Sequence, residues 1–148
     1  MESGRGAGRG KGEERLSAMK NAPGAGCPCG GPAYAQCCGR LHQGTPAESA
    51  EQLMRSRYSA YALGLMEYVH RTWHADTRPP LSALTHDPAA KWLGLEVKRH
   101  QAQGDEATVE FVARYKVGGR AHRLHETSRF VREEGKWLYV DGRFAETD

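Results

Sequence analysis

Four cysteines lie close together near the start of this sequence, and the chain contains no others. They are Cys27, Cys29, Cys37 and Cys38, and a short stretch rich in glycine and proline separates the two pairs. Four thiolates at this spacing suit tetrahedral coordination, and zinc is commonly held by four sulfur ligands in closed structural sites. The spacing therefore predicts a structural zinc ion held by these four side chains.

Two other uses of the cysteines compete with zinc. Two disulfides would suit a secreted module, but no secretion signal opens the chain, and a bond between adjacent cysteines would be strained. An iron–sulfur cluster also takes four cysteines as ligands, and this alternative stays open. A zinc ion held by four protein ligands has no open coordination position. We therefore expect a structural role and not a catalytic one for the zinc site.

Composition limits the classes of protein to consider. The 148 residues are 39% hydrophobic, which suffices for one core. No apolar run approaches the ~18 residues of a membrane span, so we expect a cytoplasmic protein without membrane contact. The net charge is +3, and residues 1–24 carry two of these charges. The rest of the chain is nearly neutral, so its charge gives little support for nucleic acid as a partner.

The chain divides into three predicted parts. Residues 1–24 are rich in glycine and arginine and are predicted to be a disordered tail. Residues 25–41 form the cysteine knuckle, and residues 45–148 form an α+β domain. In this domain Thr45 and Glu48 resemble the two partners of a helix-capping box. Apolar residues at helical spacing follow, Gly64 interrupts them, and Asp87-Pro88 predicts one more helical turn.

The second half of the domain alternates polar and apolar residues with a period of two, which is typical of half-buried strands. Strands are predicted over residues 95–103, 109–117, 120–132 and 136–144, with hairpin signals at Gly118-Gly119 and Gly135. Helices followed by a run of strands indicate an α+β fold. We expect the helices to pack on one face of a curved, four-stranded antiparallel sheet.

Strand pairing predicts a polar group on the inner face of this sheet. With a hairpin at Gly118-Gly119, Phe111 opposes Glu126, and His125 points to the other face. A second hairpin at Gly135 would place Ser128 opposite Asp141 and Glu126 opposite Arg143, although a one-residue slip would send Asp141 and Arg143 outside. Glu126 and Asp141 are then the candidate catalytic or ligand-binding groups. The competing interpretation is structural, with Glu126 neutralised by Arg143 or Arg57.

The cysteine segment resembles a known motif. The run CPCGGPAYAQCCG is similar to the SEC-C zinc knuckle, with Cys27, Cys29 and Cys37 as its first three ligands. Cys38 stands where some copies of the motif carry histidine. Some SEC-C knuckles serve in binding, so the resemblance implies that this one could contact a protein partner.

The rest of the chain resembles the YchJ family of bacterial proteins from about Gly26 to Phe144. The resemblance is carried by LMRSRYSAY (Leu53–Tyr61), by Thr72-Trp73-His74, by the His125–Phe130 segment and by Trp137–Gly142. It implies a SEC-C knuckle followed by a cone-shaped domain similar to nuclear transport factor two. Proteins of that fold often bind small molecules in the cone.

Three functional hypotheses follow. The first is a small zinc-binding cytoplasmic protein whose knuckle is a structural or protein-interaction module. The second is an enzyme or ligand-binding protein that uses the cone cavity, with Glu126 and Asp141 as working groups. The third is binding to nucleic acid or the ribosome through the tail and knuckle. No serine elbow, phosphate loop or nucleotide fingerprint occurs, so the sequence assigns no catalytic activity.

Overall fold

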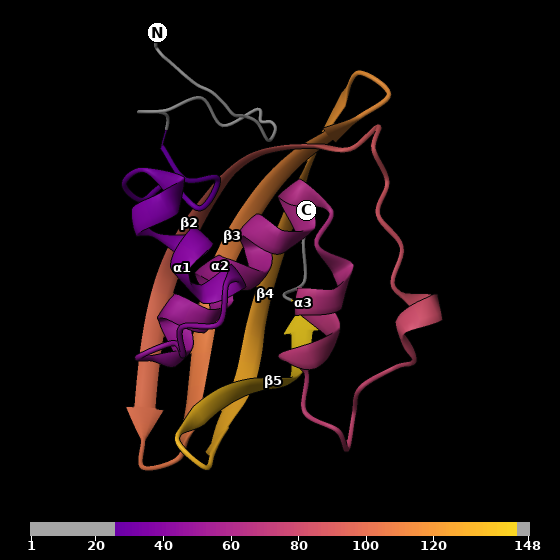
Figure 1. The fold of residues 1–148 in the computed structure, drawn as a ribbon. Coiled ribbons are helices and arrows are strands. Elements are labelled where there is room, and N and C mark those ends of the chain that lie inside the picture. Colours follow the sequence, from indigo (N-terminus) through magenta and orange to yellow (C-terminus); the bar gives the residue numbers. More distant parts are fainter. Residues whose placement is uncertain (1–25, 145–148) are drawn as a thin grey trace, which may run out of the picture.

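A computed structural model describes residues 26–144 of the chain, and the predicted tail, residues 1–24, lies outside them. The described chain begins with short helical elements and continues into four long strands (Figure 1). The elements are the 3-10 helix η1 (Tyr34–Gln36), α1 (Cys38–His42), α2 (Ala50–Leu63), α3 (Met66–Arg71), the 3-10 helix η2 (Leu81–Ala83), β2 (Lys91–Gln103), β3 (Glu106–Val117), β4 (Arg120–Glu133) and β5 (Lys136–Phe144).

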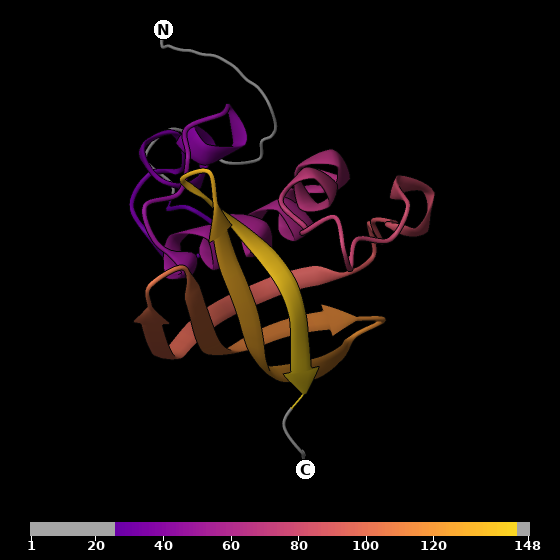
Figure 2. The same cartoon turned by 90° about the horizontal axis from the view of Figure 1, so that it is seen from below.

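The four strands form one antiparallel meander in the order β2-β3-β4-β5. The sheet is strongly curved, and the helical elements all lie on one side of it (Figure 2). The predicted α+β fold is therefore confirmed. The strand pattern buries alternate residues of β3 and β4 against α2, which explains the period of two in the sequence.

Helix α2 begins four residues later than the capping signals predict. Ser49 is its N-cap, and the Ser49 hydroxyl accepts a hydrogen bond of 3.1 Å from the backbone amide of Gln52. The predicted cap at Thr45 is wrong, because Thr45 belongs to the turn after α1, where its amide donates to the Arg40 carbonyl, and the helix begins only at Ala50. At its other end α2 stops where predicted, at Gly64, which has a φ of 80°.

Removing the Ser49 hydroxyl is expected to weaken the start of α2. We expect Ser49→Ala to lower the free energy of unfolding by about 1 kcal/mol, because the Gln52 amide loses its partner. Thr45→Ala is the matched control and should change stability by less than about 0.5 kcal/mol. Urea unfolding of both variants measures the difference. A larger loss in Thr45→Ala would show that the cap lies at Thr45.

The helical turn predicted at Asp87-Pro88 is also wrong. The Asp87 side chain accepts from the amide of Ala89, and its carbonyl accepts from the amide of Ala90, so this segment forms a single tight turn. The chain then enters β2 at Lys91. Trp92 consequently lies in a strand, where its ring contacts Tyr58 and Tyr115.

The hairpin between β3 and β4 has the predicted register. Val117 pairs with Arg120, and Phe111 pairs with Glu126, as two glycines with positive φ at Gly118 and Gly119 require. His125 points away from the helices, as predicted, and its Nε2 lies 2.7 Å from a carboxylate oxygen of Glu110.

The hairpin between β4 and β5 departs from the predicted register after its first pairs. Phe130 pairs with Tyr139 as predicted, but a β-bulge follows, and Arg129 pairs with Asp141. The bulge leaves Val140 as an extra residue, and the Val140 carbonyl accepts a hydrogen bond from Thr77 in the segment after α3. Residues of β5 beyond this point therefore change faces.

This change of face corrects two predicted site residues. Ser128 lies opposite Gly142, not Asp141, and Glu126 lies opposite Phe144, not Arg143. The Asp141 carboxylate lies on the outer face, where it forms an exposed ion pair with the Arg129 guanidinium at 2.7 and 2.8 Å. A one-residue slip in the turn would also have placed Asp141 on the outer face. In the structure the cause is a bulge within strand β5.

The knuckle and the sheet share one hydrophobic core. Cys27, Cys29 and Cys38 pack in the same cluster as Leu53 of α2 and Phe130 of β4. A smaller cluster joins the end of α1 to α2 and α3. The cysteines are thus integral to the packing, which matters for what a bound metal would do. The proposed boundary between residues 25–41 and 45–148 stays a sequence prediction.

Candidate functional site

The four cysteines come together as their spacing predicts. Their Sγ atoms all lie within 4.8 Å of one another, and no disulfide joins them. The distance between Cys29 Sγ and Cys37 Sγ, 3.6 Å, is far beyond the length of a disulfide bond. Cys29 is fully buried, and only Cys37 is partly exposed. The cluster has four convergent sulfur donors at distances that a metal ion can span.

The glycines of the knuckle allow this convergence. A side chain at Gly31 would place its Cβ 2.8 Å from Cys37 Sγ, so a larger residue would displace a ligand. Gly30 has a φ of 96° and donates its amide to the Cys27 carbonyl at 2.9 Å, which closes a tight turn. The amide of Cys27 in turn donates to the Pro32 carbonyl at 2.8 Å.

Two side chains of helix α2 contact the cysteine cluster. The Ser59 hydroxyl lies 3.4 Å from Cys27 Sγ, and the guanidinium of Arg55 donates to the Cys29 carbonyl at 3.1 Å. Arg55 also binds Glu51 one turn earlier. A cation beside a group of thiolates offsets part of their negative charge.

The four thiols influence one another's ionisation because their sulfur atoms are close together. The pKa of Cys27 is lowered, chiefly by hydrogen bonds from Cys29 and Cys38. Hydrogen bonding to Cys27 raises the pKa of Cys38, and burial raises the pKa of Cys37 to about 11. Without a cation, one thiolate is therefore stabilised at the expense of its neighbours. A divalent metal removes this conflict because it allows all four sulfurs to be deprotonated.

A half-buried histidine ties the knuckle to α2. His42 Nδ1 lies 2.6 Å from the Tyr34 hydroxyl, and Nε2 lies 2.9 Å from the Ser56 carbonyl. Since a carbonyl only accepts, Nε2 carries the proton and Nδ1 accepts from Tyr34. The His42 ring also packs edge-on against Tyr68 at 4.6 Å. No sequence signal predicts this network, because its partners lie on three separate elements.

Protonation of His42 is expected to destabilise the fold. Burial lowers the pKa of His42 below its ordinary value of 6.5. Between that value and the folded-state pKa, the unfolded chain binds more protons than the folded one. The His42 contribution to stability is therefore complete above pH 6.5 and declines as pH falls through the lowered pKa. Unfolding experiments from pH 8 to 5 should show a steeper loss for the wild type than for His42→Gln. Parallel profiles would contradict this expectation.

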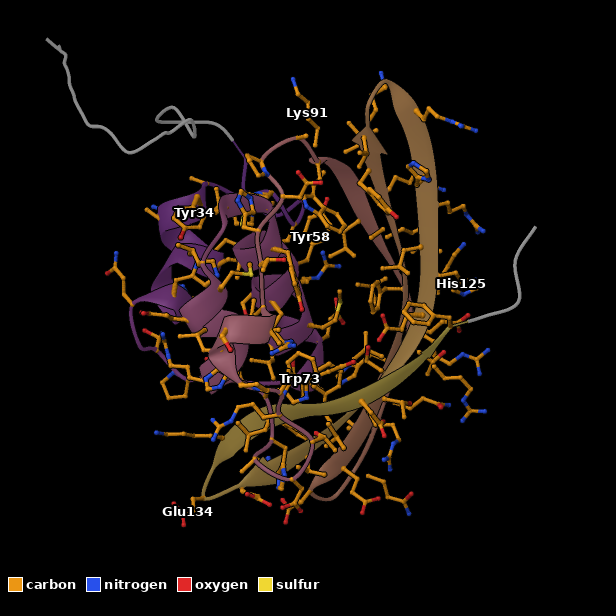
Figure 3. The ribbon with its side chains drawn as sticks, turned by 90° about the vertical axis from the view of Figure 1, so that its right-hand side faces the viewer. Tyr34, Tyr58, Trp73, Lys91, His125 and Glu134 are labelled. Carbon is orange, nitrogen blue, oxygen red and sulfur yellow. The ribbon has the colours of Figure 1, made fainter. Side chains whose placement is uncertain are left out.

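A second site lies between α2 and the concave face of the sheet. This cavity has a volume of about 350 Å³, and most of its lining is aromatic or aliphatic. Figure 3 shows Tyr58 on the helical side of this space. Its walls are formed by Met54, Arg57, Tyr58, Tyr61, Trp92, Phe111, Ala113, Leu124, Glu126, Ser128, Phe130, Tyr139, Gly142 and Phe144. The volume is at the lower end of the range for small-molecule sites.

Glu126 lies in the cavity as predicted, and Asp141 does not. Oε2 of Glu126 accepts hydrogen bonds from the Ser128 hydroxyl at 3.0 Å and the Tyr139 hydroxyl at 3.3 Å. The carboxylate lies directly over Gly142, where the Cβ of any larger residue would fall 1.7 Å from Oε2. The predicted pair with Arg143 is wrong, because the bulge places Arg143 opposite Thr127 on the outer face.

Arg57 is the polar group on the opposite wall. Its Nη1 donates to the Val69 carbonyl at 2.8 Å and to the Thr72 hydroxyl at 2.7 Å. The guanidinium lies over the rings of Tyr139 and Trp73, with its central carbon 4.4 and 5.2 Å from their centroids. Burial lowers its pKa, and Glu126 is among the groups that oppose this effect. Among the described residues, Arg57 forms no direct ion pair with Glu126.

Fold and site together define a small cysteine-knuckle protein with a cone-shaped domain. Residues 49–142 match the family model described as the YchJ middle NTF2-like domain. A UPF0225 protein of Ralstonia nicotianae is 61% identical over 134 residues, which cover 82% of this chain and 92% of the relative. The chain therefore belongs to the YchJ, or UPF0225, family.

Solved structures agree with this assignment. A SEC-C motif containing protein from Rhodopseudomonas palustris has a TM-score of 0.71 and 35% sequence identity, covering 81% of this chain and 98% of that one. A second SEC-C motif containing protein, from Psychrobacter arcticus, has a TM-score of 0.62 and 29% identity, with 82% and 84% covered. No helix in the described part of this chain is long and apolar enough to cross a membrane.

Proposed function

We propose that Cys27, Cys29, Cys37 and Cys38 bind one zinc ion, which holds the knuckle against α2. The observation that carries this proposal is the convergence of four sulfur atoms within 4.8 Å. An all-sulfur donor set favours zinc over the harder cations, and four protein ligands leave no coordination position open. On this proposal the metal is structural, and the protein resides in the reducing cytoplasm, where its thiols stay available.

The position of the ligands supports a structural role for the metal. Three of the four are buried in the core that includes α2 and the sheet. Residues 26–42 otherwise contribute few apolar side chains, and small units of this size generally need a metal or disulfides to fold. The bound ion would therefore supply the stability that the knuckle sequence lacks.

The outer side of the knuckle is the surface that a protein partner would contact. Pro32, Ala35, Gln36 and Arg40 are among the exposed residues of the knuckle. Such contact is compatible with a structural metal, because the ion would fix the shape of the surface without touching the partner.

Metal analysis of the purified full chain tests the proposal. We expect one zinc ion per chain, and we expect it to remain in Ser59→Ala, which removes only a neighbour of Cys27 Sγ. A preparation without zinc, or one that contains iron with visible absorbance, would overturn the proposal. Reconstitution with zinc after purification under reducing conditions guards against loss of the ion during handling.

A further inference from the structure

The cone cavity is not explained by the zinc proposal. It is a separate space of about 350 Å³ between α2 and the sheet, none of the four cysteines lines it, and seven aromatic side chains do. Well-packed cores contain few voids larger than a water molecule. A cavity of this size with two charged groups in its wall has the composition of a small-molecule site.

The two charged groups of the wall have unused hydrogen-bonding capacity. Arg57 is 6% exposed and Glu126 is 8% exposed, so both are more than nine-tenths buried. The protein engages only Nη1 of Arg57 and Oε2 of Glu126, and among residues 26–144 the Arg57 Nε and Nη2 and the Glu126 Oε1 have no partner. None of these three atoms belongs to the fully buried unpartnered atoms of the described residues, so each keeps contact with solvent and is free to bind a group that enters the cavity.

The two charges also restrict the charge of that group. An anion would be attracted by Arg57 but repelled by Glu126. A cation would be attracted by Glu126 but repelled by Arg57. Since both side chains line the same cavity, their charges cancel for an occupant that contacts both. A neutral occupant meets no such repulsion, and it satisfies both walls if it donates to the carboxylate and accepts from the guanidinium.

The aromatic lining defines the remainder of the occupant. Tyr58 and Tyr61 line the cavity from α2, and the rings of Trp92, Phe111 and Phe130 line it from the sheet. Rings in this arrangement bind flat aromatic molecules by stacked or edge-to-face contacts. We propose that the cone cavity binds a neutral, planar aromatic compound that donates a hydrogen bond to Glu126 and accepts one from Arg57.

Three compounds with one indole ring system test the charge preference. Indole-3-acetamide is neutral and carries a donor and an acceptor, indole-3-acetate is an anion, and tryptamine is a cation. Titration of the zinc-loaded full chain, followed by NMR, should show the amide shifting resonances of cavity residues. The amide should bind at least about tenfold more tightly than either charged analogue, a difference of about 1.4 kcal/mol.

Glu126→Gln makes the test specific to the proposed pair. This variant keeps the shape of the side chain but leaves the charge of Arg57 uncompensated. Indole-3-acetate should then bind more tightly than the amide, which reverses the wild-type order. Glu110→Gln is the matched control, because it removes a carboxylate from the outer face beside His125, and its order should not change. Leu124→Trp should block all three compounds by filling the cavity.

The outcomes that overturn the proposal are distinct. Failure of all three compounds to bind the wild type at millimolar concentration would do so, as would tighter binding of either charged analogue. An unchanged order in a folded Glu126→Gln variant would show that the carboxylate does not set the preference. If that variant does not fold, the proposal is judged by the order of the three affinities in the wild type and by the loss of binding in Leu124→Trp. Zinc content, measured in the same samples, reports on the knuckle separately.

Discussion

Cys29→Ser is expected to remove the zinc ion and to lower the free energy of unfolding by more than about 4 kcal/mol. Cys29 is fully buried in the shared core, so the substitution removes a metal ligand and also places an unpartnered hydroxyl there. Loss of a structural metal belongs to the few single changes that have effects of this size. Zinc content and denaturant unfolding of the purified variant measure the two expected losses.

Ala35→Ser is the matched control for this experiment. Ala35 lies in the same knuckle but is exposed, so the added hydroxyl is solvated and touches no ligand. We expect one zinc ion per chain and an unfolding midpoint close to that of the wild type. If Cys29→Ser retained stoichiometric zinc and its unfolding midpoint, the proposed ligand set would be wrong.

Gly142→Ala is expected to cost about 3 kcal/mol, although it adds only one methyl group. The new Cβ would lie 1.7 Å from Oε2 of Glu126 and 2.6 Å from its Cδ, so the carboxylate would have to move. Movement of this buried group breaks its hydrogen bonds with Ser128 and Tyr139. Thermal and denaturant unfolding should both report the loss.

Two further variants identify the cause of that loss. Gly94→Ala is the matched control in strand β2, where an added Cβ meets nothing within 4 Å, and it should change stability little. Combining Gly142→Ala with Glu126→Ala should recover part of the loss, because the methyl group then occupies the space of the carboxylate. Strictly additive effects would show that Gly142 is not constrained by Glu126.

Local sequence signals predicted the hairpin between β3 and β4 correctly. The glycine pair at Gly118-Gly119 imposes a tight hairpin, and the polar–apolar alternation on both sides then fixes the register through Glu126. The cysteine cluster was equally accessible from sequence, since the two pairs lie within twelve positions. In both cases residues close together in the chain determine the geometry.

The second half of the candidate site depended on tertiary contacts. The bulge at Val140 accompanies a hydrogen bond to Thr77 and a short bridge between Trp73 and Tyr139, neither of which follows from the pattern of β5. One signal was present: a glycine inside a strand pattern, here Gly142, often marks a bulge or a close approach. Here the glycine marks the close approach of the Glu126 carboxylate, and the bulge lies two residues earlier, at Val140.

The role of Arg57 was only partly predictable. Sequence reasoning named it as one of two partners for Glu126, but its contacts with Val69, Thr72 and the Tyr139 ring depend on how α3 packs against α2. The sequence left two interpretations of Glu126 open, a structural pair and a ligand-binding group. In the structure each of its two carboxylate oxygens fits a different one. Oε2 serves the fold, and Oε1 has no partner among the described residues and is available to an occupant of the cavity.

X-ray absorption at the zinc edge reports which atoms bind the metal. We expect a first shell of four sulfur atoms at about 2.3 Å from a single zinc ion in the full chain. The shell should be unchanged in Ser59→Ala, because the Ser59 hydroxyl contacts Cys27 Sγ but is not a ligand. A shell with nitrogen or oxygen ligands in place of any sulfur, or a metal other than zinc, would contradict this prediction.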